Sequence, residues 1–221
     1  MPSFAFSRQP ESVAAAWFSS RAGQVLLESE QDVLQVALSQ RAGLASLWLG
    51  PQAALAPTDV DELPLLRLSS DAWPLLQGDV RCTLPLPLAT ESCATVIVQH
   101  VEIQGSASQQ LLDECARVLI PGGRLWLLAL NPFAPYRLRW RGSGLGAREP
   151  VTWRRRLRGA GLLPDSLTRG LGPSWAELPD GRLQDGVGLR AAYLLRAEKR
   201  QLPLTPMRAR PLLRWAPGGA A

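Results

Sequence analysis

Residues 92–132 read SCATVIVQHVEIQGSASQQLLDECARVLIPGGRLWLLALNP. The β-branched run from Thr95 to Val98 predicts a buried strand, and the fully apolar run from Leu125 to Leu130 predicts another. Between them, apolar residues recur at helical spacing over 107–119, and Pro121-Gly122-Gly123 predicts a turn. Two buried strands joined by a helix form a βαβ crossover. This stretch therefore predicts parallel pairing and a sheet covered on both faces.

The rest of the chain adds further elements of an α/β domain. The predicted helical segments are residues 11–42, with a break at Gly23 and an end at Gly43, and a helix near 150–160. The other predicted strands are residues 44–49, 65–68 and 189–197. We therefore expect three parts, namely an N-terminal helical extension (1–43), the α/β domain (44–200) and a proline-rich tail (201–221).

The composition is that of a folded globular protein. Of 221 residues, 46% are hydrophobic and 19% are charged, which excludes a disordered chain. No apolar stretch approaches the roughly 20 residues of a transmembrane helix, and the first ten residues lack the pattern of a secretory signal. The three cysteines, Cys82, Cys93 and Cys115, have no metal-ligand spacing, so we predict no metal site. Their odd, low number suits a reducing compartment, and the cytoplasm is the expected location.

The charge is divided unevenly along the chain. Residues 1–120 hold six arginines and 13 acids, a net charge of −7, whereas residues 121–221 hold 18 basic residues and six acids, a net charge of +12. The segment from Arg137 to Arg158 also contains Tyr136, Trp140 and Trp153. Interleaved rings and arginines suit stacking and phosphate contact, so an anionic partner is one interpretation of this segment. A solvated charged face is the other.

The stretch from Leu86 to Pro132 resembles the second half of a class I S-adenosylmethionine-dependent methyltransferase. The matching parts are the Leu86-Pro87-Leu88 turn, the strand before His100, the following helix, the Pro-Gly-Gly turn and the next strand. The tail KRQLPLTPMRAR (199–210) is similar to a bacterial subgroup of such proteins. The resemblance implies a Rossmann-like fold with a mostly parallel sheet, helices on both faces and an N-terminal helical extension. It also implies S-adenosylmethionine as the cofactor.

The resemblance assigns roles to particular residues. The family's first strand usually ends in acid-x-Gly-x-Gly-x-Gly, of which only Gly50 remains, and Pro51 removes an amide donor. Cys82 stands where an aspartate usually contacts adenine, three residues after Asp79. The implied cofactor residues are Leu49, Gly50, Ser69 after the second strand, Cys82, Gln99 and His100. Asn131 and Pro132 would face the methyl acceptor.

Two functions follow from these observations. One is methyl transfer from S-adenosylmethionine to an unknown acceptor, although no catalytic residue can be named. Positioning alone supplies much of the rate of such a reaction, so the lack of an acid/base pair does not exclude it. The other is a catalytically inactive methyltransferase fold that serves as a binding or scaffold protein and contacts an anionic partner. The depleted glycine loop favours the second function, and the resemblance favours the first.

Overall fold

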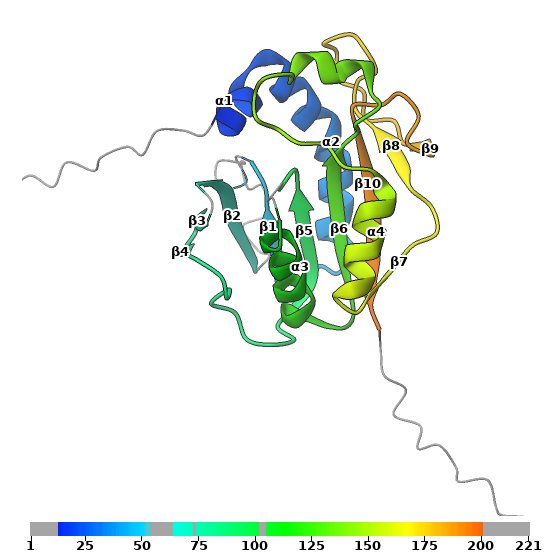
Figure 1. Ribbon diagram of the computed structural model, residues 1–221. Helices are drawn as coiled ribbons and strands as arrows, with labels where there is room; N and C mark the ends of the chain where they lie inside the picture. Colours follow the sequence, from blue (N-terminus) through cyan, green and yellow to red (C-terminus); the bar gives the residue numbers. More distant parts are fainter. Residues whose placement is uncertain (1–12, 52, 54–63, 73, 102–104, 201–221) are drawn as a thin grey trace, which may run out of the picture.

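A computed structural model describes residues 13–51, 53, 64–72, 74–101 and 105–200 of the chain. It is an α/β fold built on one large sheet with the strand order β4-β3-β2-β1-β5-β6-β10-β8-β9, and β7 pairs with β10 (Figure 1). The predicted βαβ crossover is confirmed. β5 (Cys93–Gln99) and β6 (Leu119–Leu130) run parallel, with Val96 opposite Leu125.

The sheet is mixed, and in this respect the expected mostly parallel sheet is only partly correct. β1 (Ser46–Leu49) pairs in parallel with β2 (Leu65–Ala72) and β5, as β5 does with β6, whereas the six other pairings among the described strands are antiparallel. Only two residues separate β2 from β3, too few for a parallel crossover. The other strands are β3 (Leu75–Gly78), β4 (Arg81–Cys82), β7 (Leu162–Pro164), β8 (Arg169–Leu171), β9 (Gln184–Asp185) and β10 (Ala192–Lys199).

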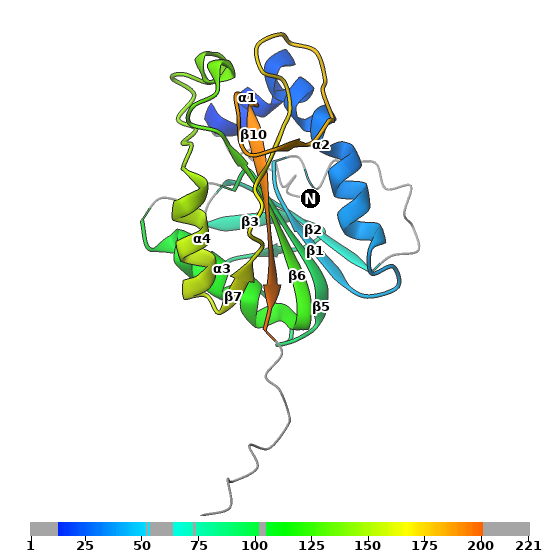
Figure 2. The same cartoon turned by 90° about the vertical axis from the view of Figure 1, so that its right-hand side faces the viewer.

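Helices cover both faces of the sheet (Figure 2). α1 (Val13–Ser19) and α2 (Arg21–Ser39) lie on one face, and α3 (Ala107–Val118) and α4 (Pro150–Gly159) lie on the other. Side chains alternate along the central strands, so Ile97 packs toward α1 and α2 while Val96 and Val98 pack toward α3 and α4. None of the described helices has the length and apolar character needed to cross a bilayer.

The N-terminal helices break at Ser20 and not at the predicted Gly23. The Ser20 hydroxyl accepts a hydrogen bond from the Gly23 amide at 3.3 Å, which makes Ser20 the N-cap of α2. Gly23 has a different role. A Cβ atom there would lie 2.3 Å from the carbonyl oxygen of Trp17, so only glycine permits this close approach of α1 to α2.

Two of the predicted strands were too short. β2 continues to Ala72 because it forms a hairpin with β3, so Ser69 lies inside the strand, opposite Gln77, and not after it. β6 begins at Leu119, and the predicted Pro-Gly-Gly turn is an irregularity within it, where Gly122 has a φ of 74°. The proline-rich tail (201–221) lies outside the described residues.

Candidate functional site

The candidate site lies where β1, β5 and β6 reach their carboxyl ends, at the top of Figure 1. Gly50 follows β1 directly, and its amide donates to the carbonyl oxygen of Leu68 at 3.0 Å. The side chain of Gln99, at the end of β5, lies against it. A Cβ atom built on Gly50 would meet both Cβ and Oε1 of Gln99 at 3.0 Å. The space beside Gly50 is therefore already filled by the protein.

Hydrogen bonds hold the Gln99 side chain at both of its polar atoms. The indole Nε1 of Trp48 donates to Gln99 Oε1 at 3.0 Å, and Gln99 Nε2 donates to Glu30 Oε2 at 2.7 Å. Gln99 is 1% exposed and Glu30 is fully buried. Because buried amides without partners are costly, both bonds fix Gln99 in this position.

Glu30, from α2, also binds His100 just after β5. The two Glu30 carboxylate oxygens lie 2.8 and 3.0 Å from His100 Nε2, and both side chains are fully shielded from solvent. His100 has a φ of 49°, a conformation that costs energy in a residue other than glycine, and its ring stacks on Phe18 at 5.3 Å. The network of Trp48, Gln99, His100 and Glu30, hereafter the Glu30 network, joins the N-terminal helices to the sheet.

A small cavity adjoins His100 on the side of α4. Its volume of about 10 Å³ has room for about one water molecule. His100 Nδ1 and Trp153 Nε1 are buried without a hydrogen-bond partner among the described residues, and both residues line the cavity. The other lining residues are Val101, Leu127, Leu128, Ala129, Leu130, Leu145, Gly146 and Arg148. The cavity is far too small for a nucleoside.

The surroundings of Gly50 do not fit the cofactor that the resemblance implies. In that family, bare backbone at the end of the first strand leaves room for the methionine end of S-adenosylmethionine. Here the Gln99 side chain lies beside Gly50, and Trp48 anchors it there.

The structure brings together only some of the residues that the sequence assigned to the cofactor. Gly50, Gln99 and His100 meet, and Leu49 is a fully buried core residue beside them. Ser69 and Cys82 belong to the β2–β3–β4 hairpins, where Cys82 is opposite Leu76 and burial raises the pKa of its thiol.

Asp79, the nearest acid to Cys82, is already bound. The backbone amide and the guanidinium of Arg67 donate to its carboxylate at 2.8 and 3.1 Å. Burial raises the pKa of Asp79, but the hydrogen bonds from Arg67 outweigh this effect and hold the pKa below its usual range. An adenine amino group would have to compete with Arg67 for this carboxylate.

Asn131 was expected to face a methyl acceptor, but its side chain binds the protein itself. Its Nδ2 donates to the carbonyl oxygens of Gly188 and Arg190 at 3.1 and 2.8 Å, and its Oδ1 accepts from the Phe133 amide at 3.0 Å. Asn131 is fully buried, whereas Pro132 is half-buried. Asn131 therefore joins the end of β6 to the segment before β10.

The aromatic residues of the arginine-rich segment do not form a stacking surface. Tyr136, Trp140 and Trp153 are all buried in the core, so the stacking interpretation of this segment was wrong. Arg154 donates to the carbonyl oxygens of Asp165 and Ser166, and Arg156 lies 5.5 Å from the centre of the Trp153 ring. Both arginines therefore make contacts within the protein, whereas Arg155 between them is exposed.

Glu30 was not predicted as a site residue, although the sequence contains a pattern that indicates a buried carboxylate at this position. The apolar face of α2 is formed by Val25, Leu26, Val33, Leu34, Ala37 and Leu38, and Glu30 lies four residues after Leu26 on that same face. A charged residue inside an apolar stripe predicts a buried carboxylate with a partner. Its partners, however, follow in the chain only after about 70 residues.

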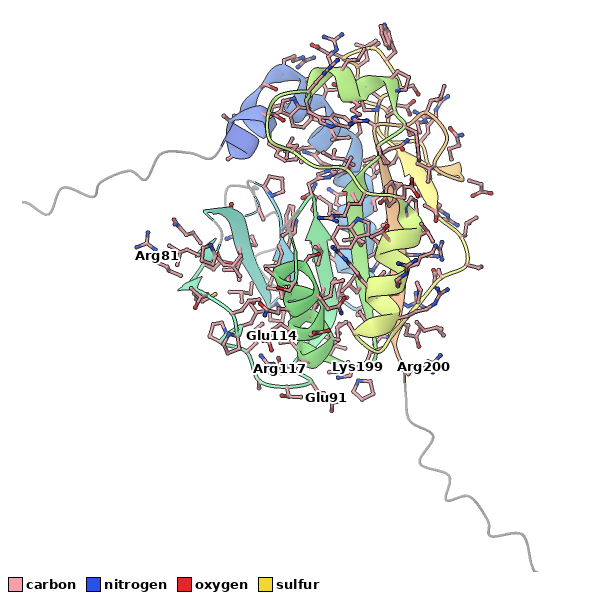
Figure 3. The ribbon with its side chains drawn as sticks, in the orientation of Figure 1. Arg81, Glu91, Glu114, Arg117, Lys199 and Arg200 are labelled. Carbon is pink, nitrogen blue, oxygen red and sulfur yellow. The ribbon has the colours of Figure 1, made fainter. Side chains whose placement is uncertain are left out.

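The opposite end of the sheet carries charged pairs with a structural role (Figure 3). Arg117 binds Glu114 within α3 at 2.9 Å and donates to the carbonyl oxygens of Leu86 and Leu88. Glu114 accepts from the Leu86 amide at 2.9 Å. These two side chains hold the Leu86-Pro87-Leu88 turn against α3. The hydrogen bond from Arg117 holds the pKa of Glu114 below its usual range, against the opposing effect of burial.

We expect Glu114→Gln to lower the free energy of unfolding at pH 7 by about 1.5 kcal/mol, the lower end for hydrogen bonds to a charged group. Because the folded-state pKa of Glu114 is below the unfolded value of about 4.3, its contribution is complete above that pH. The contribution is lost as the pH falls through the folded-state pKa. Urea unfolding at pH 7 and at successively lower pH measures this. A difference between the two proteins that persists unchanged in acid would contradict the assignment.

Comparisons with known proteins agree on the fold. No family model matches the sequence, and no curated protein is similar to it by sequence. A SAM-dependent methyltransferase from Thermotoga maritima superposes with a TM-score of 0.55 at 16% identity, over 84% of this chain and 94% of that chain. A complex of the Haloferax volcanii Trm112 methyltransferase activator with a methyltransferase gives 0.53 at 12% identity, over 87% and 100%. SpnF, named as a 4+2 cyclase, gives 0.50 at 14% identity, over 78% and 80%. The chain thus has the class I methyltransferase fold. This fold is also found in SpnF, a protein named for a different activity.

Proposed function

We propose that this chain is a class I methyltransferase fold that does not use S-adenosylmethionine and acts as a binding protein for an anionic partner. The observation that carries the proposal is the Gln99 side chain, which fills the space beside Gly50 and is held there by Trp48 and Glu30. The net charge of +12 in residues 121–221 supports an anionic partner.

The energy of opening the site supports this proposal. To admit a methionine moiety, Gln99 would have to leave Trp48 and Glu30, which breaks its hydrogen bonds with the half-buried Trp48 indole and with the buried Glu30 carboxylate. Each buried group left without a partner costs about 1–3 kcal/mol, so opening costs about 2–6 kcal/mol. At about 1.4 kcal/mol per factor of ten, the affinity for the cofactor falls by roughly 1.5 to 4 powers of ten.

The second candidate function is methyl transfer from S-adenosylmethionine to an unknown acceptor. The superposition with the Thermotoga maritima methyltransferase over 84% of this chain favours it. In this function the cofactor would lie along Leu49, Gly50, Ser69, Cys82, Gln99 and His100, and the acceptor would approach Asn131 and Pro132.

Calorimetric titration separates the two functions. We expect S-adenosylmethionine and S-adenosylhomocysteine to give no binding heat at millimolar concentration, because Gln99 blocks the site. The matched variant is Gln99→Ala, which removes the blocking amide, and weak binding to this variant alone would identify Gln99 as the block. Micromolar affinity in the unaltered protein would overturn the proposal in favour of methyl transfer.

We also propose a cytoplasmic location. All three cysteines carry free thiols, and burial raises the pKa of Cys93 and Cys115. Free thiols support a reducing compartment, and none of the three is activated as a nucleophile.

A further inference from the structure

Large apolar side chains are exposed around the carboxyl end of the sheet. Half of the 12 exposed large hydrophobic residues in the described part of the chain lie in two segments there, residues 133–138 and 175–189. Each of these six residues is 42 to 68% exposed. We call these residues the apical surface. They are Phe133, Leu138, Trp175, Leu178, Leu183 and Leu189. Contiguous exposed apolar surface marks an interaction site, whereas single exposed leucines do not.

The two segments are joined by specific contacts. Arg139, at the end of the short helix η2 (Pro135–Arg139), forms an ion pair with Glu177. Asn131 binds the carbonyl oxygens of Gly188 and Arg190, and the Ala191 amide donates to the Pro173 carbonyl at 2.9 Å. Both segments lie at the top of the molecule in the two perpendicular views (Figures 1 and 2). The apical surface is therefore presented by one connected platform.

The charges of this platform are mainly basic. Its segments 131–141 and 172–191 hold five arginines and three acids. Glu177 and Asp180 are paired with Arg139 and Arg190, so these two acids are neutralised. In the described residues, the exposed Arg137, Arg141 and Arg182 make no ion pair with a carboxylate. The remaining acid is Asp185, so the two segments that carry the exposed leucines and aromatic rings also carry an excess of arginine.

We propose that the apical surface docks on an anionic lipid bilayer. Exposed leucines, Phe133 and Trp175 have the chemistry to enter the boundary between headgroups and acyl chains, and the arginines have the chemistry to bind lipid phosphates. Single-stranded nucleic acid stacks its bases on exposed rings, but four of the six apical residues are leucines, which offer no ring for stacking. This inference rests on the proposed binding role, since it names the anionic partner.

Vesicle flotation tests the proposal with the full chain. We expect binding to vesicles of phosphatidylcholine mixed with phosphatidylglycerol, little binding to phosphatidylcholine alone, and weaker binding at high salt. Replacing Arg137 and Arg141 by glutamine should weaken binding by about fivefold per arginine. Leu178→Ser with Trp175→Ser should also weaken binding, and because both side chains are exposed, these changes should leave the fold intact.

Matched controls lie on another part of the molecule. Arg155 and Arg158 on α4 and Leu163 on β7 are exposed, so Arg155→Gln with Arg158→Gln, and Leu163→Ser, should leave vesicle binding unchanged. Equal losses in the apical and control variants would overturn the proposal. Binding to RNA or DNA without binding to vesicles, or self-association through the apical surface, would also overturn it. Micromolar binding of S-adenosylmethionine would refute the non-catalytic role separately, and would leave a positive vesicle result standing.

Discussion

Replacing Glu30 by alanine is expected to lower the free energy of unfolding by about 3–5 kcal/mol, because the change leaves His100 and Gln99 buried without their partner. Both Glu30 and His100 side chains are fully shielded from water, so no solvent replaces the lost carboxylate. Urea unfolding followed by circular dichroism measures the loss. Glu28→Ala provides the control on the same helix, since Glu28 is exposed, and should change stability by less than about 0.5 kcal/mol.

A double-mutant cycle measures the interaction energy between Glu30 and His100 separately from their other contacts. If Glu30 and His100 stabilise each other, replacing both by leucine should cost less than the sum of the two single replacements, because neither buried side chain is then left without the other as its hydrogen-bond partner. Additive losses, or a loss below about 1 kcal/mol for Glu30→Ala, would show that the Glu30 network is open to water in solution.

Replacing Gly50 by valine is expected to lower the free energy of unfolding by about 1–3 kcal/mol, the usual range for overpacking a filled core. The new Cβ would lie 3.0 Å from Cβ and Oε1 of Gln99 and 3.2 Å from the Gln99 carbonyl oxygen. The backbone carbonyl cannot turn aside without disturbing β5. A cofactor cleft over Gly50 would accept the valine, so the same measurement distinguishes a filled site from an empty one.

Gly159→Ala is the matched control for this change. At Gly159, in the last turn of α4, an added Cβ would meet only the Gln109 side chain, at 3.5 Å, which is an ordinary contact. We expect this variant to be more stable than the unaltered protein by about 0.4–1 kcal/mol, because alanine reduces the entropy of the unfolded chain. If Gly50→Val left stability unchanged, Gly50 would border an open space, as the methyltransferase interpretation requires.

The crossover at residues 92–132 could be predicted because its signals are local. The apolar runs of β5 and β6 and the helical spacing of α3 each lie within one element, and connection geometry fixes their pairing. The antiparallel additions could not be predicted in the same way. β8 and β9 have only three and two residues, too few to show a periodic pattern.

The position of the candidate site could be predicted from the sequence, but whether the site is open or filled by side chains could not. The pattern placed Gly50, Gln99 and His100 at one edge of the sheet, and the structure brings these three together. Whether that edge is open depends on Glu30, which reaches Gln99 across 69 residues of sequence. The buried rings of the arginine-rich segment were missed for a related reason, since local composition does not reveal which face of a segment meets the core.

The Glu30 network has a consequence for how substitutions at this edge of the sheet combine. Gln99 Nε2 and His100 Nε2 both bind the Glu30 carboxylate, and Gln99 Oε1 accepts from Trp48, so a change at one of these residues alters the hydrogen bonding of the others. Residues in one such network show interaction energies of about 0.5–3 kcal/mol, so the effects of changes here should not add. The four residues therefore form one epistatic unit, and we expect variation at one of them to be accompanied by variation at the others.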